Sequence, residues 1–205
     1  MLSIDREPLR VTVVLGAPAV GGAESWLFGL TDHLTHVDLD VIALAPGAAA
    51  DLFAARGHRV EVLETGPTPG AVAVGTARLA RLLRRSNPDV VLANGVKAAA
   101  VAVPAGALAG IRTVWAKHDF VWDAEIGAPL GRLADSVVAT SVELLEAVSP
   151  RSGVVIPPPW PSNPAAAPDQ ATKFWRDHGV DFTGPTLVTV GRLIGYKGVD
   201  DAISA

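Results

Sequence analysis

Short runs of β-branched and aliphatic residues recur along the first three quarters of the chain, and longer helical patterns separate them. The runs that predict strands lie at 11–15, 40–44, 59–63, 89–93, 113–117, 136–140 and 154–156. Such alternation is typical of βαβ units, which build a parallel sheet covered by helices on both faces. The sequence therefore predicts an α/β domain with a parallel sheet of about seven strands.

The composition excludes several classes of function. Of the 205 residues, 49% are hydrophobic, which is enough for the core of a folded protein. The net charge of -4 argues against a general nucleic-acid binder, and the lack of cysteine excludes disulfides and thiolate metal sites. The start has no apolar signal core, and the most apolar run, 98–111, contains Pro104 and is shorter than the roughly 20 residues of a spanning helix. We therefore expect a cytoplasmic protein.

The stretch Gly21-Gly22-Ala23-Glu24 lies between the first predicted strand and the first predicted helix. In open parallel sheets such turns border the ligand crevice. Two adjacent glycines let a ligand approach the backbone, and the free N–H groups of the following helix favour an anion. Two alternatives stay open: the glycines serve only the packing of strand on helix, and Glu24 completes the hydrogen bonding of its own helix.

Two phosphate-binding motifs are absent from this region. Gly16 and Gly21 have the spacing of a P-loop, but Gly22-Ala23 stands where Lys-Ser/Thr is required. The segment 16–22 also lacks the G-x-G-x-x-G rhythm of a dinucleotide site. A kinase, an ATPase and an NAD-dependent dehydrogenase are therefore disfavoured.

Polar residues follow two further predicted strands. Asn94 comes after the strand 89–93, and His118-Asp119 come after the strand 113–117. Because the carboxyl ends of parallel strands meet at one edge, we expect these residues to lie near the glycine pair. His118 is then placed to meet a substrate, while Asp119 either joins it or orients the loop.

The other histidines and the basic helix carry weaker signals. His33 and His36 lack a carboxylate partner for a metal ion, so we predict no metal site. Four arginines interleave with leucines in the helix before Asn87: Arg78, Arg81, Arg84 and Arg85. This basic face indicates either an ordinary solvated helix or peripheral contact with an anionic membrane surface.

The proline-rich stretch 157–168 cannot sustain a helix or a sheet, and we predict that it is a linker. The domain before it is 1–156. After it, 169–178 predicts a helix, 186–190 a strand, and the residues from 198 onwards another helix. One strand and two helices cannot bury a core of their own. We therefore interpret 169–205 as the incomplete start of a second α/β domain in a truncated chain.

Four motifs give the chain a resemblance to a known family. They are Gly21-Gly22-Ala23-Glu24, His118-Asp119, Val155-Ile156-Pro157, and Val190-Gly191-Arg192-Leu193 continued by Tyr196-Lys197-Gly198. On these motifs the chain resembles, over almost its whole length, the retaining glycosyltransferases of family 4. Their GT-B fold sets two Rossmann-like domains face to face across a cleft. The resemblance implies that 1–156 is the N-terminal, acceptor-side domain and that 169–205 begins the donor-binding domain.

The family transfers a sugar from a nucleotide sugar to an acceptor, with retention at the anomeric carbon. By resemblance, His118 contacts the transferred sugar, Arg192 and Lys197 bind the donor diphosphate, and Gly21 and Gly22 approach the diphosphate or the acceptor. The resemblance suggests weaker contacts with acceptor or sugar for three further residues: Glu24, Asn94 and Asp119. Two cations at the departing diphosphate would stabilise the transition state without a metal. We accordingly expect no cofactor besides the nucleotide-sugar co-substrate.

One departure from the family limits this prediction. The paired glutamates that bind the donor in the family would lie beyond Ala205, so the missing partner is the C-terminal donor domain. This chain alone should then show little or no transfer. Two alternatives stay open: a non-enzymatic domain that binds a sugar, an acceptor or a membrane surface, and a sugar-nucleotide epimerase of the same architecture. The sequence does not identify the acceptor, the donor sugar or the nucleotide base.

Overall fold

A computed structural model describes residues 7–158, 168–180, 188–189, 195 and 198–204. The chain divides into two compact units, Met1–Trp160 and Pro161–Ala205, and each is considered by itself. The predicted division into 1–156, a linker at 157–168 and a second domain from 169 stays a prediction.

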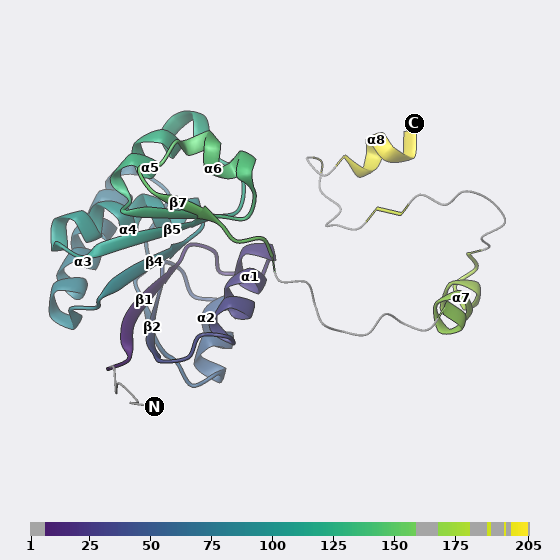
Figure 1. Ribbon diagram of the computed structural model, residues 1–205, viewed down its shortest axis with the longest axis horizontal. Coiled ribbons are helices and arrows are strands. Elements are labelled where there is room, and N and C mark those ends of the chain that lie inside the picture. Colours follow the sequence, from purple (N-terminus) through teal and green to yellow (C-terminus); the bar gives the residue numbers. More distant parts are fainter. Residues whose placement is uncertain (1–6, 159–167, 181–187, 190–194, 196–197, 205) are drawn as a thin grey trace, which may run out of the picture. The chain divides into compact units, whose positions relative to one another are not determined.

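The first unit contains a seven-stranded sheet in the order β3-β2-β1-β4-β5-β6-β7 (Figure 1). All neighbouring strands are parallel. The strands are β1 (Leu9–Leu15), β2 (Val37–Ala43), β3 (Arg59–Val62), β4 (Val90–Asn94), β5 (Arg112–Lys117), β6 (Ser136–Ala139) and β7 (Gly153–Val155). The predicted parallel α/β sheet is therefore confirmed. The largest difference is at β2, which begins three residues before the predicted strand because Val37 pairs with Leu9.

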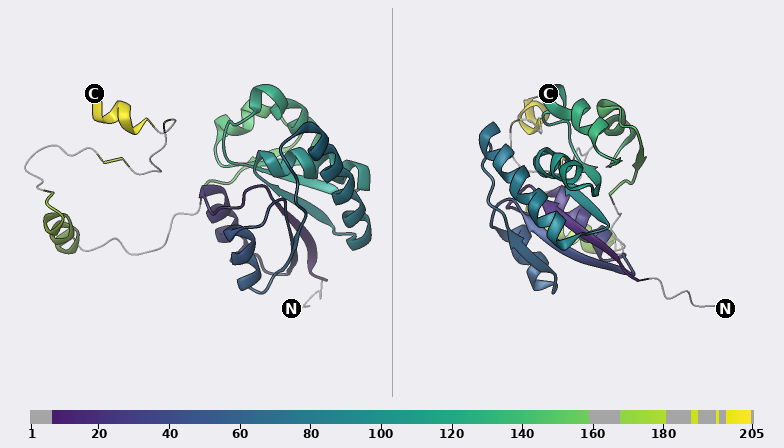
Figure 2. Two further views of the ribbon diagram at one scale, coloured as in Figure 1. Left: turned by 180° about the vertical axis from the view of Figure 1, so that it is seen from behind. Right: turned by 90° about the vertical axis from the view of Figure 1, so that its left-hand side faces the viewer.

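Helices cover both faces of this sheet (Figures 1 and 2). They are α1 (Gly22–Thr31), α2 (Ala48–Ala55), α3 (Pro69–Ser86), α4 (Val96–Ala109), a π-helix η1 (Asp123–Gly127), α5 (Ala128–Leu133) and α6 (Val142–Val148). One core cluster packs α1 and α2 against the sheet, and the other packs α3, α4, α5 and α6 against the opposite face. Side chains alternate between the two clusters along β1, with Val13 and Leu15 in one and Val14 in the other.

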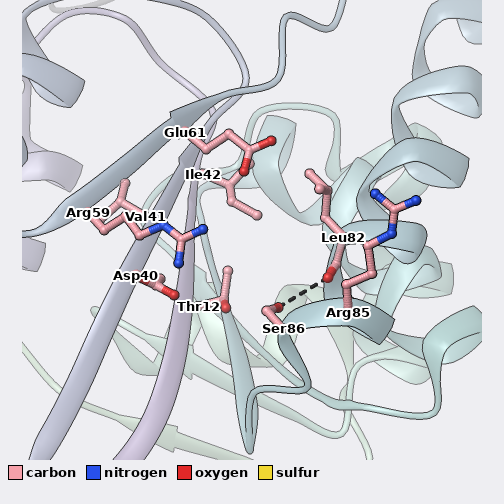
Figure 3. A pocket seen from close by; sticks show the side chains of 9 residues that line it. All are labelled: Thr12, Asp40, Val41, Ile42, Arg59, Glu61, Leu82, Arg85 and Ser86. Carbon is pink, nitrogen blue, oxygen red and sulfur yellow. Dashed lines mark hydrogen bonds between the residues drawn. The ribbon is translucent and has the colours of Figure 1, made fainter.

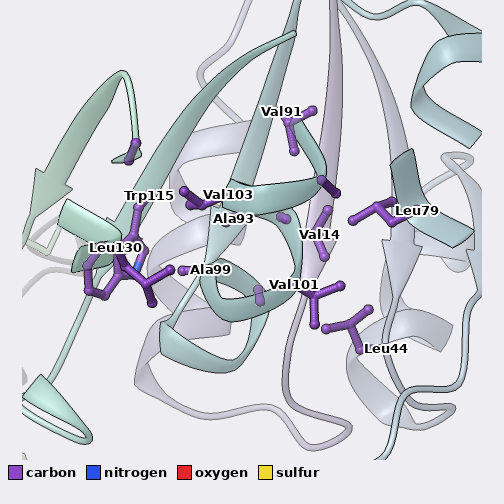
Figure 4. Packing of buried hydrophobic residues seen from close by; sticks show 14 of the residues in the cluster. Val14, Leu44, Leu79, Val91, Ala93, Ala99, Val101, Val103, Trp115 and Leu130 are labelled. Atoms are coloured by element: carbon purple, nitrogen blue, oxygen red, sulfur yellow. The ribbon is translucent and has the colours of Figure 1, made fainter. Parts of the chain in front are cut away.

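The helix α3 shows how local sequence sets an element. Thr68 accepts a hydrogen bond from the Ala71 N–H at 3.3 Å, and Pro69 occupies the first helical position. Asn87, with φ of 46°, ends the helix in the left-handed conformation. Leu79 points from this helix into the core beside Val14 (Figure 4), which fixes α3 against β1 and its neighbour β4.

The sequence analysis did not predict η1 and α5. Their sequence is short and contains two glycines and a proline, which are weak helix formers. The fold requires the small residue at Gly131, because a Cβ there would lie 2.6 Å from the Val148 carbonyl oxygen. Close packing on α6 therefore overrides local preference in this segment.

In the second unit the structure describes α7 (Pro168–Asp177) and α8 (Val199–Ser204). Both agree with predicted helices to within a residue at their starts. Most of the strand predicted at 186–190 lies outside the described residues. Among the helices that the structure describes, none is long and apolar enough to cross a membrane.

Candidate functional site

The candidate site lies where the order of the strands reverses. From β1 the chain passes to β2 and β3 on one side, and then returns through α3 to β4 on the other side. Loops that leave such a switch point diverge, and ligands of open α/β sheets bind in the crevice between them. The turn after β1 and the residue that ends β4 therefore border this crevice.

A chain of hydrogen bonds connects the ends of three strands at this edge. The carboxylate of Glu24 accepts from the Gly21 N–H at 3.0 Å and from Asn94 Nδ2 at 3.3 Å. Asn94 Oδ1 lies 2.9 Å from Nε2 of His118. We call Glu24, Asn94 and His118 the relay. Glu24 is 4% exposed and Asn94 is 2% exposed, so water does not compete for these bonds.

The relay fixes the proton on the imidazole. A carboxylate can only accept, so the amide nitrogen of Asn94 faces Glu24 and its oxygen faces His118. Nε2 of His118 therefore donates, and in the neutral ring Nδ1 keeps its lone pair. Burial lowers the pKa of His118 from 6.5 to about 4, against the opposing effect of the Asp119 carboxylate. At neutral pH the ring is uncharged, and Nδ1 is buried without a hydrogen-bond partner among the described residues.

Trp26 holds the other side of the imidazole. The two rings pack edge to face with centroids 5.1 Å apart, and the indole N–H donates to the Ile156 carbonyl at 3.2 Å. Sequence reasoning did not single out Trp26. Its position two residues after Glu24 in α1 follows no catalytic pattern, so only the fold reveals the contact.

A buried lysine controls the loop that follows His118. Lys117 is 1% exposed, and its ammonium donates to the Asp119 carbonyl at 2.6 Å and to Asp123 Oδ1 at 2.5 Å. It also lies 5.3 Å from the ring centroid of Trp115. Oδ1 of Asp119 accepts from the Val121 N–H at 3.1 Å, so this side chain braces the loop.

The glycine pair opens onto free space. A Cβ added to Gly22 would meet no atom within 4 Å, and neither Gly21 nor Gly22 has a positive φ. Gly21 precedes α1, whose first N–H groups have no side-chain cap. At Gly22, then, neither backbone strain nor packing requires glycine, and the space beside it is available to a ligand.

The structure brings four of the predicted site residues into one hydrogen-bonded chain: Gly21, Glu24, Asn94 and His118. Asp119 contacts its own loop, and Gly22 lies beside the chain. The two predicted diphosphate ligands, Arg192 and Lys197, lie outside the described residues. Within the described ranges, no group of three or more metal-binding side chains is placed to hold a metal ion.

A separate pocket of about 300 Å³ lies between α3 and the strands β1, β2 and β3 (Figure 3). Its lining includes Thr12, two arginines and two carboxylates, and the charged ends of Arg59 and Arg85 lie on opposite sides of it. The paired positions Thr12, Asp40 and Arg59 precede the carboxyl ends of their strands. This pocket is therefore distinct from the relay.

Solved structures with the same fold include several bacterial proteins. The Anabaena protein HepE, in complex with UDP and glucose, is 21% identical with a TM-score of 0.66, over 83% of this chain and 50% of that chain. Acinetobacter baumannii MurG is 16% identical with a TM-score of 0.59, over 78% and 50%. A glycosyltransferase from Rickettsia africae is 15% identical with a TM-score of 0.61, over 94% and 55%. The chain thus spans about half the length of these proteins.

These structural neighbours have the GT-B fold, so the first unit is a Rossmann-like domain of that fold, as predicted. No curated protein sequence matches the chain. The model of the family described as Glycosyltransferase Family 4 matches residues 20–163, which include the whole relay and more than half of the chain. The chain therefore belongs to glycosyltransferase family 4.

Proposed function

We propose that this chain forms the acceptor side of a glycosyltransferase that moves a sugar from a nucleotide sugar to an acceptor, with retention and without a metal ion. The relay at the strand switch point carries this proposal, because it presents a neutral, oriented imidazole at the crevice. Family membership supports sugar transfer, and the complex of HepE with UDP and glucose supports a nucleotide-sugar donor.

In this proposal the half-buried His118 is the catalytic residue, and it contacts the transferred sugar. A neutral ring suits this role, because a cation there would oppose the positive charge that develops on the anomeric carbon as the leaving group departs. Glu24 and Asn94 act as positioning residues instead of contacting acceptor or sugar. Both oxygens of Glu24 and both polar atoms of Asn94 are already bonded within the protein.

The leaving group needs a different set of residues. When the bond between the anomeric carbon and the phosphate oxygen breaks, its electron pair stays on the diphosphate; the acceptor oxygen bonds to the anomeric carbon, and its proton passes to a diphosphate oxygen. The open space at Gly22 and the free N–H groups of α1 suit such an anion. We assign the balancing positive charges to Arg192 and Lys197. Fixed cations there would stabilise the developing charge more than the ground state, which removes the need for a metal ion.

The test uses the natural polypeptide that carries this sequence, captured from its source cells with an antibody against the first unit. It is incubated with a panel of nucleotide sugars and a lipid and glycan extract of the same cells, with and without EDTA. The proposal predicts transfer from one donor class, unaffected by EDTA, with a product whose anomeric configuration by NMR matches the donor.

Four outcomes would contradict the proposal. Inversion at the anomeric carbon would remove the retaining mechanism, and loss of activity in EDTA would remove metal independence. Formation of an epimerised nucleotide sugar without any transfer would favour the alternative hypothesis that the protein is an epimerase. Saturable binding of the extract with no donor consumed would favour a binding domain.

A further inference from the structure

Another cavity lies at the carboxyl edge of the sheet, and none of the relay residues lines it. It has a volume of about 310 Å³ and lies among the loops after β1, β2 and β3 and the first turns of α4. Its walls are mostly apolar and include Pro18, Leu44, Pro67 and Val101. Trp122, which is 40% exposed, completes the lining from the loop after β5. A cavity of this size and composition suits the apolar part of a small ligand.

One charge accompanies this apolar lining. Among the described residues that form the cavity, Lys97 carries the single ionic side chain, and no carboxylate faces it there. The side chain of Lys97 is exposed, and the part of the chain that the structure describes supplies it with no ion pair. An anionic group on the ligand would therefore meet a cation with no partner to displace.

Short stretches of sequence connect residues of the cavity to residues of the relay. Lys97 follows the relay residue Asn94 by three positions, and Trp122 follows His118 by four. Gly16 lies against the start of α4, since a Cβ there would come within 2.9 Å of the Lys97 Cβ. A ligand held in this cavity thus lies at the same sheet edge as His118.

We propose that this cavity, which we call the Lys97 pocket, receives an acceptor that joins an apolar body to an anionic group. The apolar body fills the space beside Trp122, and the anion pairs with Lys97. An acceptor hydroxyl is then held at the crevice that His118 borders. This inference rests on the proposed function, because it names the chemical class of the acceptor.

The test measures binding by the full chain with two matched probes, n-hexyl phosphate and n-hexanol. Binding is followed by the indole N–H resonance of Trp122, which is assigned by its loss in Trp122→Phe. The proposal predicts a saturable shift with n-hexyl phosphate, and Lys97→Ala should weaken this binding about tenfold. n-Hexanol should bind more weakly than the phosphate and should be unaffected by Lys97→Ala.

Arg81→Ala is the charge-matched control, since it removes an exposed cation on α3 that does not line the pocket. It should bind n-hexyl phosphate as the unaltered chain does. Equal binding of both probes, with no effect of Lys97→Ala, would overturn the anionic part of the proposal. Inorganic phosphate binding as tightly as n-hexyl phosphate would overturn the apolar part, and an unshifted Trp122 resonance would overturn both.

The anionic amphiphile could belong to a membrane or to a soluble molecule. Phosphatidylcholine vesicles with and without phosphatidic acid distinguish these sources. Cosedimentation that needs phosphatidic acid and falls in Lys97→Ala supports a lipid acceptor. If added vesicles do not change the binding of n-hexyl phosphate, the result supports a soluble acceptor. None of these binding measurements involves the donor, so they can fail while the proposed function stands. Transfer to a neutral acceptor would also contradict this inference without contradicting the proposed function.

Discussion

At the scale of single residues, His118 decides how the site responds to pH. Its position after a buried strand could be predicted from the sequence, because the run 113–117 is rich in residues that favour a strand and ends directly before it. Its partners could not: Asn94 lies 24 positions away and Glu24 another 70. Only the order of the strands, which brings β1 beside β4 and β4 beside β5, joins them.

The lowered pKa of His118 predicts a pH-dependent stability. The folded pKa of about 4 lies below the unfolded value of 6.5, so the unfolded chain binds more protons between these values. The stabilisation is fully present above pH 6.5 and is lost as the pH falls towards 4. Between pH 7 and pH 5 the free energy of unfolding should fall by about 2 kcal/mol more in the unaltered chain than in His118→Gln. Urea denaturation at both pH values measures this, and equal losses would refute the buried, neutral imidazole.

Substitution of Gly22 should weaken donor binding without lowering the stability of the fold. Gly22→Ala adds a methyl group in open space in the first turn of α1, so stability should stay the same or rise by up to about 1 kcal/mol. Donor affinity of the natural polypeptide should fall, because the methyl group blocks the approach of the diphosphate. Gly70→Ala is the matched control, since Gly70 lies in the first turn of α3 and also faces open space. Equal donor affinity in both variants would contradict the assignment of Gly22.

At the scale of elements, the loop from Asp119 to Asp123 depends on one buried cation. From sequence alone, a lysine at the end of a strand is expected to be exposed, yet Lys117 is among the largest fully buried side chains. The helices η1 and α5 were likewise not predicted, because their helical structure follows from packing on α6 and not from local propensity. Short elements held by tertiary contacts are therefore what the sequence analysis missed.

The ion pair between Lys117 and Asp123 predicts unequal effects of removing its partners. Asp123→Ala leaves a cation that is 1% exposed without its carboxylate and should cost about 3 to 5 kcal/mol. Lys117→Met keeps an apolar side chain among the aromatic rings and leaves the carboxylate of Asp123, which is 14% exposed against 1% for the lysine. It should therefore cost less. Urea denaturation of both variants gives the comparison, and a costlier Lys117→Met would be contrary to this account.

At the scale of the whole molecule, the sequence predicted the parallel α/β sheet and the GT-B relationship, because periodicity and turn motifs are local signals. It did not predict the strand order. The contacts of β1 with both β2 and β4 pair residues up to about eighty positions apart, which no local pattern encodes. The position of the site at the switch point follows from this order.

Both core clusters of the first unit consist of residues between Val11 and Val148. We therefore predict that a fragment of residues 1–158 folds by itself, since it contains the complete sheet and both clusters. Its thermal unfolding should be cooperative, with a midpoint within a few degrees of the full chain's main transition. A fragment that unfolds without cooperativity would show that later residues complete the core.

The central claim is that the relay serves sugar transfer. The most direct measurement is the rate of acceptor-dependent release of nucleoside diphosphate by the natural polypeptide and by its His118→Gln variant. Glutamine retains a donor for Asn94 in place of Nε2 but lacks the imidazole ring. We predict that the unaltered protein releases nucleoside diphosphate and that the variant is slower by roughly 100-fold at unchanged donor affinity. Equal rates in a folded variant would contradict the claim.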